Sequence, residues 1–257
     1  MLEPKLARRS PLTDDFDLSL VANFAHQLIN PLNGIAGTID RLYEGKIKEE
    51  FRQKQRLNAI RAQIENCIVL TRNLAYLAIG FGELKESDKK TVILPQNLIE
   101  SCMFHQEEAE SRGIDLQVKE RDIQNSVQAH PDLIRQVFMN IIDNAVKYSA
   151  DNSSIEITNS IQERTSDAII SIKSRPKYQI LQTDFSKMFL IGERGENAKR
   201  ILASGTGLGL YICKEIVETA HSGKISAGRY NRDYIEFIIR LPNGSRGASA
   251  ASFRQRS

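Results

Sequence analysis

Phe24-Ala25-His26-Gln27-Leu28-Ile29-Asn30-Pro31-Leu32-Asn33-Gly34-Ile35 is the stretch that decides the fold of this chain. Around it, apolar residues recur in steps of 4 and 3, the heptad pattern of a helix that packs along one seam. The seam contains Val21, Ala25, Leu28, Leu32, Ile35, Ile39 and Leu42. His26 falls beside it, so the pattern predicts an exposed imidazole, with Asn30 one turn further on the same face.

Pro31 stands inside this helix, which is expected from about residue 16 to residue 43. Proline has no N–H to donate to the carbonyl of Gln27, and it costs about 3 kcal/mol in an ordinary helix interior. We therefore expect a distortion near His26, of the kind tolerated where a local distortion is used. The alternative is that His26 is an ordinary polar residue on a helix surface.

A second helix is expected from about residue 49 to residue 79, with its own apolar seam from Leu57 to Ala78. The short link at Glu44-Gly45-Lys46 predicts an antiparallel helical hairpin. Two helices alone cannot enclose their seams, so we expect a homodimer in which two hairpins form a four-helix bundle. The alternative is that the hairpin packs against the rest of its own chain.

A second domain is expected over residues 91–242, after a linker at 81–90 that contains glycine and charged residues. Its apolar pattern alternates between the periods of strands and of helices, which indicates an α/β two-layer sandwich. Expected helices are Pro95–Arg112, Pro131–Ser149 and Thr206–Ala220, and residues 174–204 are expected to be irregular. The polar segments 1–15 and 243–257 are expected to be disordered.

Composition narrows the functional classes. The 257 residues are 41% hydrophobic and 26% charged, with a net charge of +3, which does not favour nucleic-acid binding. No apolar run approaches the ~18–20 residues that span a bilayer, and the first residues lack a signal-peptide core. Three widely spaced cysteines suggest buried free thiols. We therefore expect a cytoplasmic protein without a membrane segment in this chain.

One face of the helix expected at Pro131–Ser149 carries Asn140, Asn144 and Lys147, at spacings of 4 and 3. An amide oxygen can ligate Mg²⁺, and a lysine supplies a point charge to phosphate. This face is a candidate cradle for a phosphate chain and its metal ion, with Asp143 and Tyr148 as less certain members. The alternative is a solvated helix surface.

A glycine-rich segment, Ser204-Gly205-Thr206-Gly207-Leu208-Gly209-Leu210-Tyr211, leads directly into another predicted helix. Glycines allow backbone N–H groups to approach an anion at a helix N-terminus. The segment fits neither a dinucleotide fingerprint nor a Walker loop. Alone it is a weak signal, and a plain helix-entry loop is its alternative; together with the asparagine-bearing helix it is a strong one.

These motifs together resemble the transmitter core of sensor histidine kinases, over about residues 16–242. The His26 segment is similar to the phosphoacceptor box, and Asn140 to Ser149 is similar to the N box. Ser204 to Leu210 is similar to the second glycine box, and Phe189 with Arg194 to the F-box region of the nucleotide lid. The N box and the glycine box also suit other ATPases of this fold, whereas the hairpin with its histidine points to a kinase.

The resemblance implies a dimeric four-helix bundle followed by a sandwich of the GHKL ATPase type that binds Mg-ATP. It implies that His26 accepts the γ-phosphoryl group, to be passed to an aspartate of a response-regulator receiver. It implies that Asn144 holds Mg²⁺ with Asn140 beside it, and that Tyr148 packs near adenine. Phosphate contacts and lid closure would fall to Lys147, Arg194, Gly205, Gly207, Leu208 and Gly209.

Two positions depart from the family. The acidic residue that follows the phosphoacceptor is replaced by Gln27, and a carboxamide cannot act as a base. The first glycine box, with the aspartate that receives the adenine amino group, is replaced by Ser174-Arg175-Pro176-Lys177-Tyr178-Gln179. Losing that charge-assisted bond costs about 1.5–3 kcal/mol. We therefore expect slow autophosphorylation and weakened nucleotide binding.

Three functions are compatible with these residues. The first is an active protein histidine kinase in a two-component system. The second is a degenerate kinase that acts as a receiver-binding module with weak or no ATP binding. The third is a receiver phosphatase that uses Asn30, because the family places a Thr or Asn one turn after the phosphoacceptor to position a water.

Overall fold

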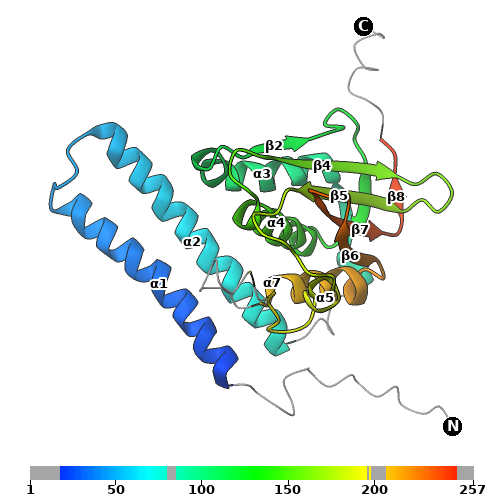
Figure 1. The fold of residues 1–257 in the computed structure, drawn as a ribbon, viewed down its shortest axis with the longest axis horizontal. Coiled ribbons are helices and arrows are strands. Elements are labelled where there is room, and N and C mark those ends of the chain that lie inside the picture. Colours follow the sequence, from blue (N-terminus) through cyan, green and yellow to red (C-terminus); the bar gives the residue numbers. More distant parts are fainter. Residues whose placement is uncertain (1–17, 80–84, 196, 198–206, 248–257) are drawn as a thin grey trace, which may run out of the picture. The chain divides into compact units, whose positions relative to one another are not determined.

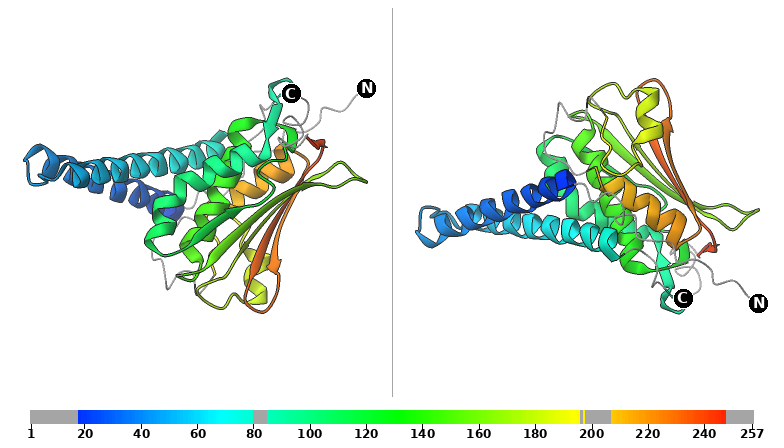
Figure 2. Two further views of the ribbon diagram at one scale, coloured as in Figure 1. Left: turned by 90° about the horizontal axis from the view of Figure 1, so that it is seen from above. Right: turned by 90° about the horizontal axis from the view of Figure 1, so that it is seen from below.

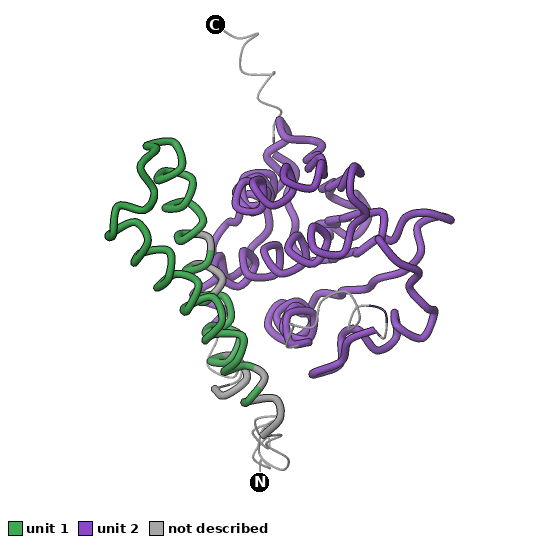
Figure 3. Tube along the Cα trace, turned by 60° about the vertical axis from the view of Figure 1, so that its left-hand side comes forward, with its two compact units in different colours: residues 1–83, 204–206 green, residues 84–203, 207–257 purple. Residues whose placement is uncertain are grey.

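The computed structural model describes residues 18–79, 85–195, 197 and 207–247. The chain divides into two compact units, coloured separately in Figure 3. Unit 1 comprises residues 1–83 and 204–206, and unit 2 comprises residues 84–203 and 207–257. Each unit is described by itself.

Unit 1 contains two long helices, α1 (Leu18–Tyr43) and α2 (Glu50–Ile79), joined as an antiparallel hairpin (Figure 1). Both predicted helices are confirmed, and α1 continues through Pro31. It ends at Tyr43, and Gly45 follows with a φ of 66°, in the left-handed region. The N–H of Lys46 donates to the carbonyl of Arg41 at 3.1 Å, which closes the helix in a Schellman motif.

Within this chain, the hairpin buries only part of the predicted seam. Phe24, Ile35 and Thr38 are buried on α1, and Ile60 and Asn73 are buried on α2. Two helices bury only the stripe between them, so an adjacent apolar stripe stays uncovered. It is formed by side chains that are 44–56% exposed: Ile29, Leu32, Ile39, Leu57, Ile64 and Ile68. Leu32, Ile39, Leu57 and Ile64 belong to the predicted seams, and their exposure is what a seam completed by a second hairpin would show; that dimer stays a prediction.

Unit 2 is built on a five-stranded mixed sheet with the order β2-β4-β5-β7-β6. Only β2 and β4 are parallel, and the other neighbours are antiparallel. The strands are β2 (Asp115–Val118), β4 (Ser154–Ile161), β5 (Ala168–Ser174), β6 (Lys224–Arg229) and β7 (Ile235–Leu241). A smaller sheet pairs β1 (Lys90–Ile93), β3 (Ser126–Ala129) and β8 (Gly244–Ser245).

Helices cover one face of the five-stranded sheet, as the two views in Figure 2 show. They are α3 (Leu94–Ser111), α4 (Pro131–Tyr148) and α7 (Gly209–Lys214), which continues into the π-helical turn η2 (Glu215–Ala220). Alternate strand residues such as Ile155, Ile170 and Ile239 are buried under them. The predicted α/β two-layer sandwich is therefore confirmed.

The structure differs from the prediction in three details. A short helix, α5 (Gln182–Lys187), lies in the region expected to be irregular, where Asp184 accepts the N–H of Leu181 at 3.0 Å. Six residues are too few to show a helical period. β8 lies beyond residue 242, where the predicted domain ended, and the 3₁₀ turn η1 (Glu86–Asp88) falls within the predicted linker. Segment 1–15 lies outside the described residues.

The described helices include none that is both long and apolar enough to cross a membrane. Cys102 and Cys213 are buried free thiols, and burial raises the pKa of each to about 12. Both therefore stay protonated and unreactive at neutral pH. Cys67 is a free thiol that is only partly buried.

Candidate functional site

Helix α4 presents the predicted amide and lysine side chains on one face. Its opposite side is buried in the core, with Phe138, Ile141 and Ile142 fully enclosed. Asn140 is buried, whereas Asn144 and Lys147 are partly exposed. The burial pattern therefore separates an apolar face from a polar face at the spacing expected from the sequence.

Asn140 connects α4 to the glycine segment. Its Nδ2 donates to the carbonyl of Gly209 at 3.3 Å, and its Oδ1 accepts from Nε2 of Gln136 at 3.2 Å. Asn144 donates its own Nδ2 to the carbonyl of Asn140 at 2.8 Å. Among the described residues, the amide oxygen of Asn144 takes part in no hydrogen bond, so it can accept a ligand.

Gly207 has a backbone position that a larger residue could not adopt, whereas Gly209 has room for a Cβ. Gly207 has a φ of 67°, and an added Cβ would lie 2.6 Å from the carbonyl carbon of Gly192. A Cβ on Gly209 would lie 3.7 Å from Cγ of Asn140. Leu208 is fully buried and packs in the core, so its side chain cannot contact a ligand. Gly205 lies outside the described residues.

Lys147 is held by Asp143, one turn before it on α4. Its Nζ lies 2.7 Å from Oδ2 of Asp143. Burial lowers the pKa of Lys147, but the attraction of Asp143 outweighs it and the net pKa is raised. Lys147 is therefore a fixed positive charge at neutral pH, beside the amide face.

The segment that replaces the first glycine box is tied to the end of α4. Pro176 forms a β-bridge with Ser149, and the N–H of Lys177 donates to the carbonyl of Tyr148 at 2.8 Å. The rings of Tyr148 and Tyr178 meet edge to face, with centroids 6.1 Å apart. Ser174, in the position of the missing aspartate, is 3% exposed. Aromatic side chains and an ordered backbone thus take the place of a glycine loop.

Phe189 and Arg194, the two residues assigned to the nucleotide lid, lie in the described part of the chain. Phe189 is buried and contacts the ring of Phe237 edge to face, with centroids 6.4 Å apart. Arg194 is partly buried and engaged within the described part of the chain.

His26 and Asn30 are both exposed on α1, as expected. Gln27 is partly buried, and its Nε2 has no hydrogen-bond partner among the described residues. The exposure of His26 and Asn30 therefore agrees with the prediction.

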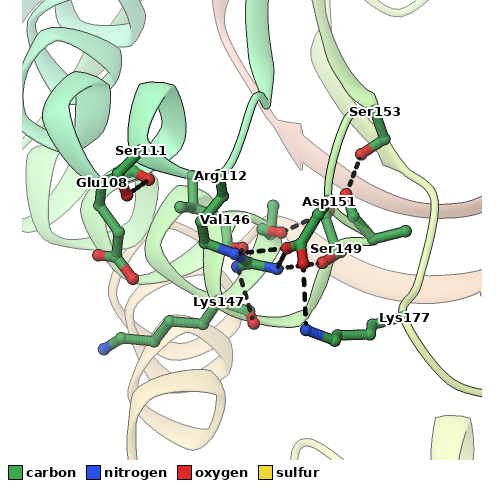
Figure 4. A network of polar contacts seen from close by, with 11 residues as sticks. Glu108, Ser111, Arg112, Val146, Lys147, Ser149, Asp151, Ser153 and Lys177 are labelled. Atoms are coloured by element: carbon green, nitrogen blue, oxygen red, sulfur yellow. Dashed lines mark hydrogen bonds and ion pairs between the residues drawn. The ribbon is translucent and has the colours of Figure 1, made fainter.

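Arg112 closes the C-terminal end of α4 (Figure 4). Its guanidinium donates to the carbonyls of Val146, Lys147 and Ser149, and to Oδ1 of Asp151 at 2.6 and 2.8 Å. It therefore caps the turn that carries Lys147 and Tyr148. The sequence analysis singled out neither Arg112 nor Gln136. Gln136 could have been found by continuing the four-residue spacing back from Asn140, whereas nothing in the sequence marks Arg112.

Comparison with known proteins agrees with this geometry. Residues 129–245 match the family described as histidine kinase-, DNA gyrase B-, and HSP90-like ATPase. The chain is 33% identical over 214 residues to the sensor protein KdpD of Clostridium acetobutylicum, covering 81% of this chain and 23% of that protein. It is 30% identical over 222 residues to the sensor protein kinase WalK of Staphylococcus aureus, covering 86% of this chain and 52% of that protein.

The chain has the sequence and fold of a sensor histidine kinase transmitter core. The histidine kinase ThkA, solved in complex with the response regulator TrrA, has the same fold, with a TM-score of 0.54, 23% identity and coverage of 88% of this chain and 61% of that one. The predicted resemblance is thereby confirmed, including the sandwich of the GHKL ATPase type. The transmitter core spans only 23% and 52% of the length of the two curated relatives.

Replacing Arg112 tests the cap on α4. Arg112→Ala is expected to lower the free energy of unfolding by about 2–3 kcal/mol, because it leaves partly buried carbonyls without a charged donor. Lys177→Ala is the matched control, since Lys177 also pairs with Asp151, at 3.4 Å, but is exposed. Its effect is expected to stay within about 1 kcal/mol. Equal effects of the two variants in urea unfolding would contradict the capping role.

Proposed function

We propose that this transmitter core is an ATP-dependent protein histidine kinase that phosphorylates itself on His26. It then passes the phosphoryl group to an aspartate of a response-regulator receiver domain. The observation that carries the proposal is the hydrogen bond from Asn140 to Gly209, because it joins the amide-bearing helix to the glycine segment. The exposed His26 on the helical hairpin favours a kinase over other ATPases of this fold.

The side chains around Asn140 fit a magnesium-bound triphosphate. The oxygen of Asn144 is available to a hard cation, which prefers few protein oxygens together with phosphates and waters. Lys147 supplies a fixed positive charge. Gly207 has a positive φ and lies against the backbone of Gly192, so its position needs a glycine. We assign Asn144, with Asn140 beside it, to the metal, and Lys147, Arg194 and the glycines to the phosphates.

Bound Mg-ATP would supply the phosphoryl group and neutralise the charge that develops during transfer. The chain would contribute by aligning the imidazole of His26 with the phosphoryl group. His26 is an exposed nucleophile on a rigid helix, and Gln27 can orient its ring by a hydrogen bond but cannot remove its proton. Because Gln27 replaces the acidic residue of the family, we expect phosphoryl transfer to be slow.

Two partners belong to the proposal. The exposed apolar stripe of α1 and α2, with Leu32, Ile39 and Leu57, is suited to burial against a second hairpin in a homodimeric four-helix bundle. A receiver domain is the second partner, as in the complex of ThkA with its response regulator. We place the protein in the cytoplasm, where ATP is present and thiols stay reduced.

The Tyr148–Tyr178 contact and the burial of Ser174 favour a second candidate function. Both lie at the end of the site where the family receives adenine. A pocket filled at that end would bind ATP weakly or not at all. The chain would then be a degenerate kinase that acts as a receiver-binding module or as a receiver phosphatase.

Autophosphorylation tests the first function. Protein incubated with Mg²⁺ and γ-labelled ATP is expected to gain an acid-labile label that His26→Ala does not gain. Gln27→Glu is expected to raise the initial rate by roughly 10²-fold, because a carboxylate restores a general base, while Gln27→Ala leaves it low. Absence of label in both the wild type and Gln27→Glu, under every Mg-nucleotide condition, would refute kinase activity.

A calorimetric titration with ATP, with and without Mg²⁺, separates the first two candidates. Asn144→Ala is expected to remove the affinity gained with Mg²⁺. Ser174→Asp is expected to tighten binding by about 10- to 100-fold, because it restores a charged acceptor for the adenine amino group. Circular dichroism checks that each variant is folded. If neither the wild type nor Ser174→Asp binds ATP, the degenerate module is the correct function.

Receiver dephosphorylation tests Asn30. Loss of phosphate from a pre-phosphorylated receiver is expected to be faster with wild type than with Asn30→Ala. Asn33→Ala is the matched control, since Asn33 is also an exposed asparagine on α1, and it is expected to behave as wild type. Identical rates for Asn30→Ala and wild type would exclude the phosphatase role.

A further inference from the structure

A second cluster of donor groups lies between α3 and α4. His105 and Glu108 are three residues apart on α3, so they share one face of that helix. Asp143 comes from α4, which packs against α3. One nitrogen or oxygen atom from each of the three side chains lies within 4.8 Å of the other two.

The imidazole of His105 has an unusual environment for a core residue. The residue is 4% exposed, and its Nε2 has no hydrogen-bond partner among the described residues. Its Nδ1 lies 3.9 Å from Oδ1 of Asp143, which is longer than a hydrogen bond. The ring also makes a hydrogen bond to the backbone of Met139, which leaves Nε2 as its unpaired nitrogen. A buried nitrogen without a partner is costly in a structural role. A ligand that binds the ring would account for its burial beside two carboxylates.

We propose that His105, Glu108 and Asp143 bind a divalent transition-metal ion, Zn²⁺ being the best match. One imidazole with two carboxylates is a donor set that zinc accepts, whereas Mg²⁺ and Ca²⁺ prefer oxygen ligands alone. Two residues three apart on one helix, with a third from the facing helix, is also how metal sites are built in helical bundles. This site is separate from the magnesium position assigned to Asn144.

The three ligand atoms need to move only slightly closer together to bind zinc. Zinc binds imidazole nitrogen and carboxylate oxygen at about 2.0–2.2 Å, so ligands of a tetrahedral site lie about 3.4 Å apart. The present limit of 4.8 Å must therefore shrink by more than an ångström. Glu108 is exposed and can make most of that movement, while His105 and α4 remain fixed. Three protein ligands leave the fourth position to water.

Lys147 competes for the same carboxylate. Its Nζ lies 2.7 Å from Oδ2 of Asp143, while Oδ1 faces His105. An ion on Oδ1 and the ammonium on Oδ2 would repel each other across one carboxylate. Removing the ammonium should therefore strengthen metal binding, which a purely structural His105–Asp143 contact would not predict.

The test is a Zn²⁺ titration of the whole chain by calorimetry, without nucleotide. All variants carry His26→Ala, which removes an exposed imidazole that could bind zinc by itself. One Zn²⁺ per chain is expected. Asp143→Asn and Glu108→Gln are each expected to weaken binding at least tenfold, since even outer partners of metal ligands are worth about 10- to 100-fold.

Glu107→Gln is the matched control, because Glu107 is an exposed neighbour on α3 outside the cluster, and it is expected to bind as the parent does. Lys147→Met is expected to tighten binding several-fold. The proposal is overturned if the parent binds no Zn²⁺ at 100 µM, or if Asp143→Asn and Glu108→Gln bind as tightly as Glu107→Gln. Mg-ATP binding is measured separately, so failure of this site leaves the proposed kinase function untouched.

Discussion

The arrangement of unit 2 depends on the hydrogen bond between Asn140 and the carbonyl of Gly209. Asn140 is buried, so its amide must be satisfied inside the protein. Gln136 satisfies the oxygen and Gly209 the nitrogen, which fixes the start of α7 against α4. A Cβ on Gly209 would lie 3.7 Å from Cγ of Asn140, an ordinary van der Waals distance, so it is the backbone carbonyl of Gly209 that matters here. Two segments far apart in sequence are thereby joined at one polar face.

The end of α4 shows how a departure from the family can be absorbed by the fold. Where the family has a glycine-rich turn, this chain has Pro176, which bridges to Ser149, and Tyr178, whose ring contacts Tyr148. Arg112 caps the same end through three carbonyls. The substituted segment is therefore well ordered by its contacts. These contacts fill the end of α4 with aromatic side chains and paired backbone.

Residue spacing predicted the polar side of the site because a helix places residues three and four apart on one face. The same rule gave the exposure of His26 and Asn30. It could not give the cap formed by Arg112 or the close approach of Gly207 to the backbone at Gly192, because these contacts join positions with no periodic relation. Burial of Leu208 was also missed: within the glycine motif it looks like a loop residue, but its side chain enters the core.

The sequence by itself determined the two helices of unit 1, the alternation of strands and helices in unit 2, and the motifs that identify the transmitter core. These follow from local periodicity and from short patterns of residue type. Only the tertiary structure decided which apolar stripe of the hairpin is buried, how β2 and β4 pair in parallel, and that His105 and Asp143 face each other between α3 and α4. Each of these depends on packing between segments distant along the chain, and no local pattern encodes which segments meet.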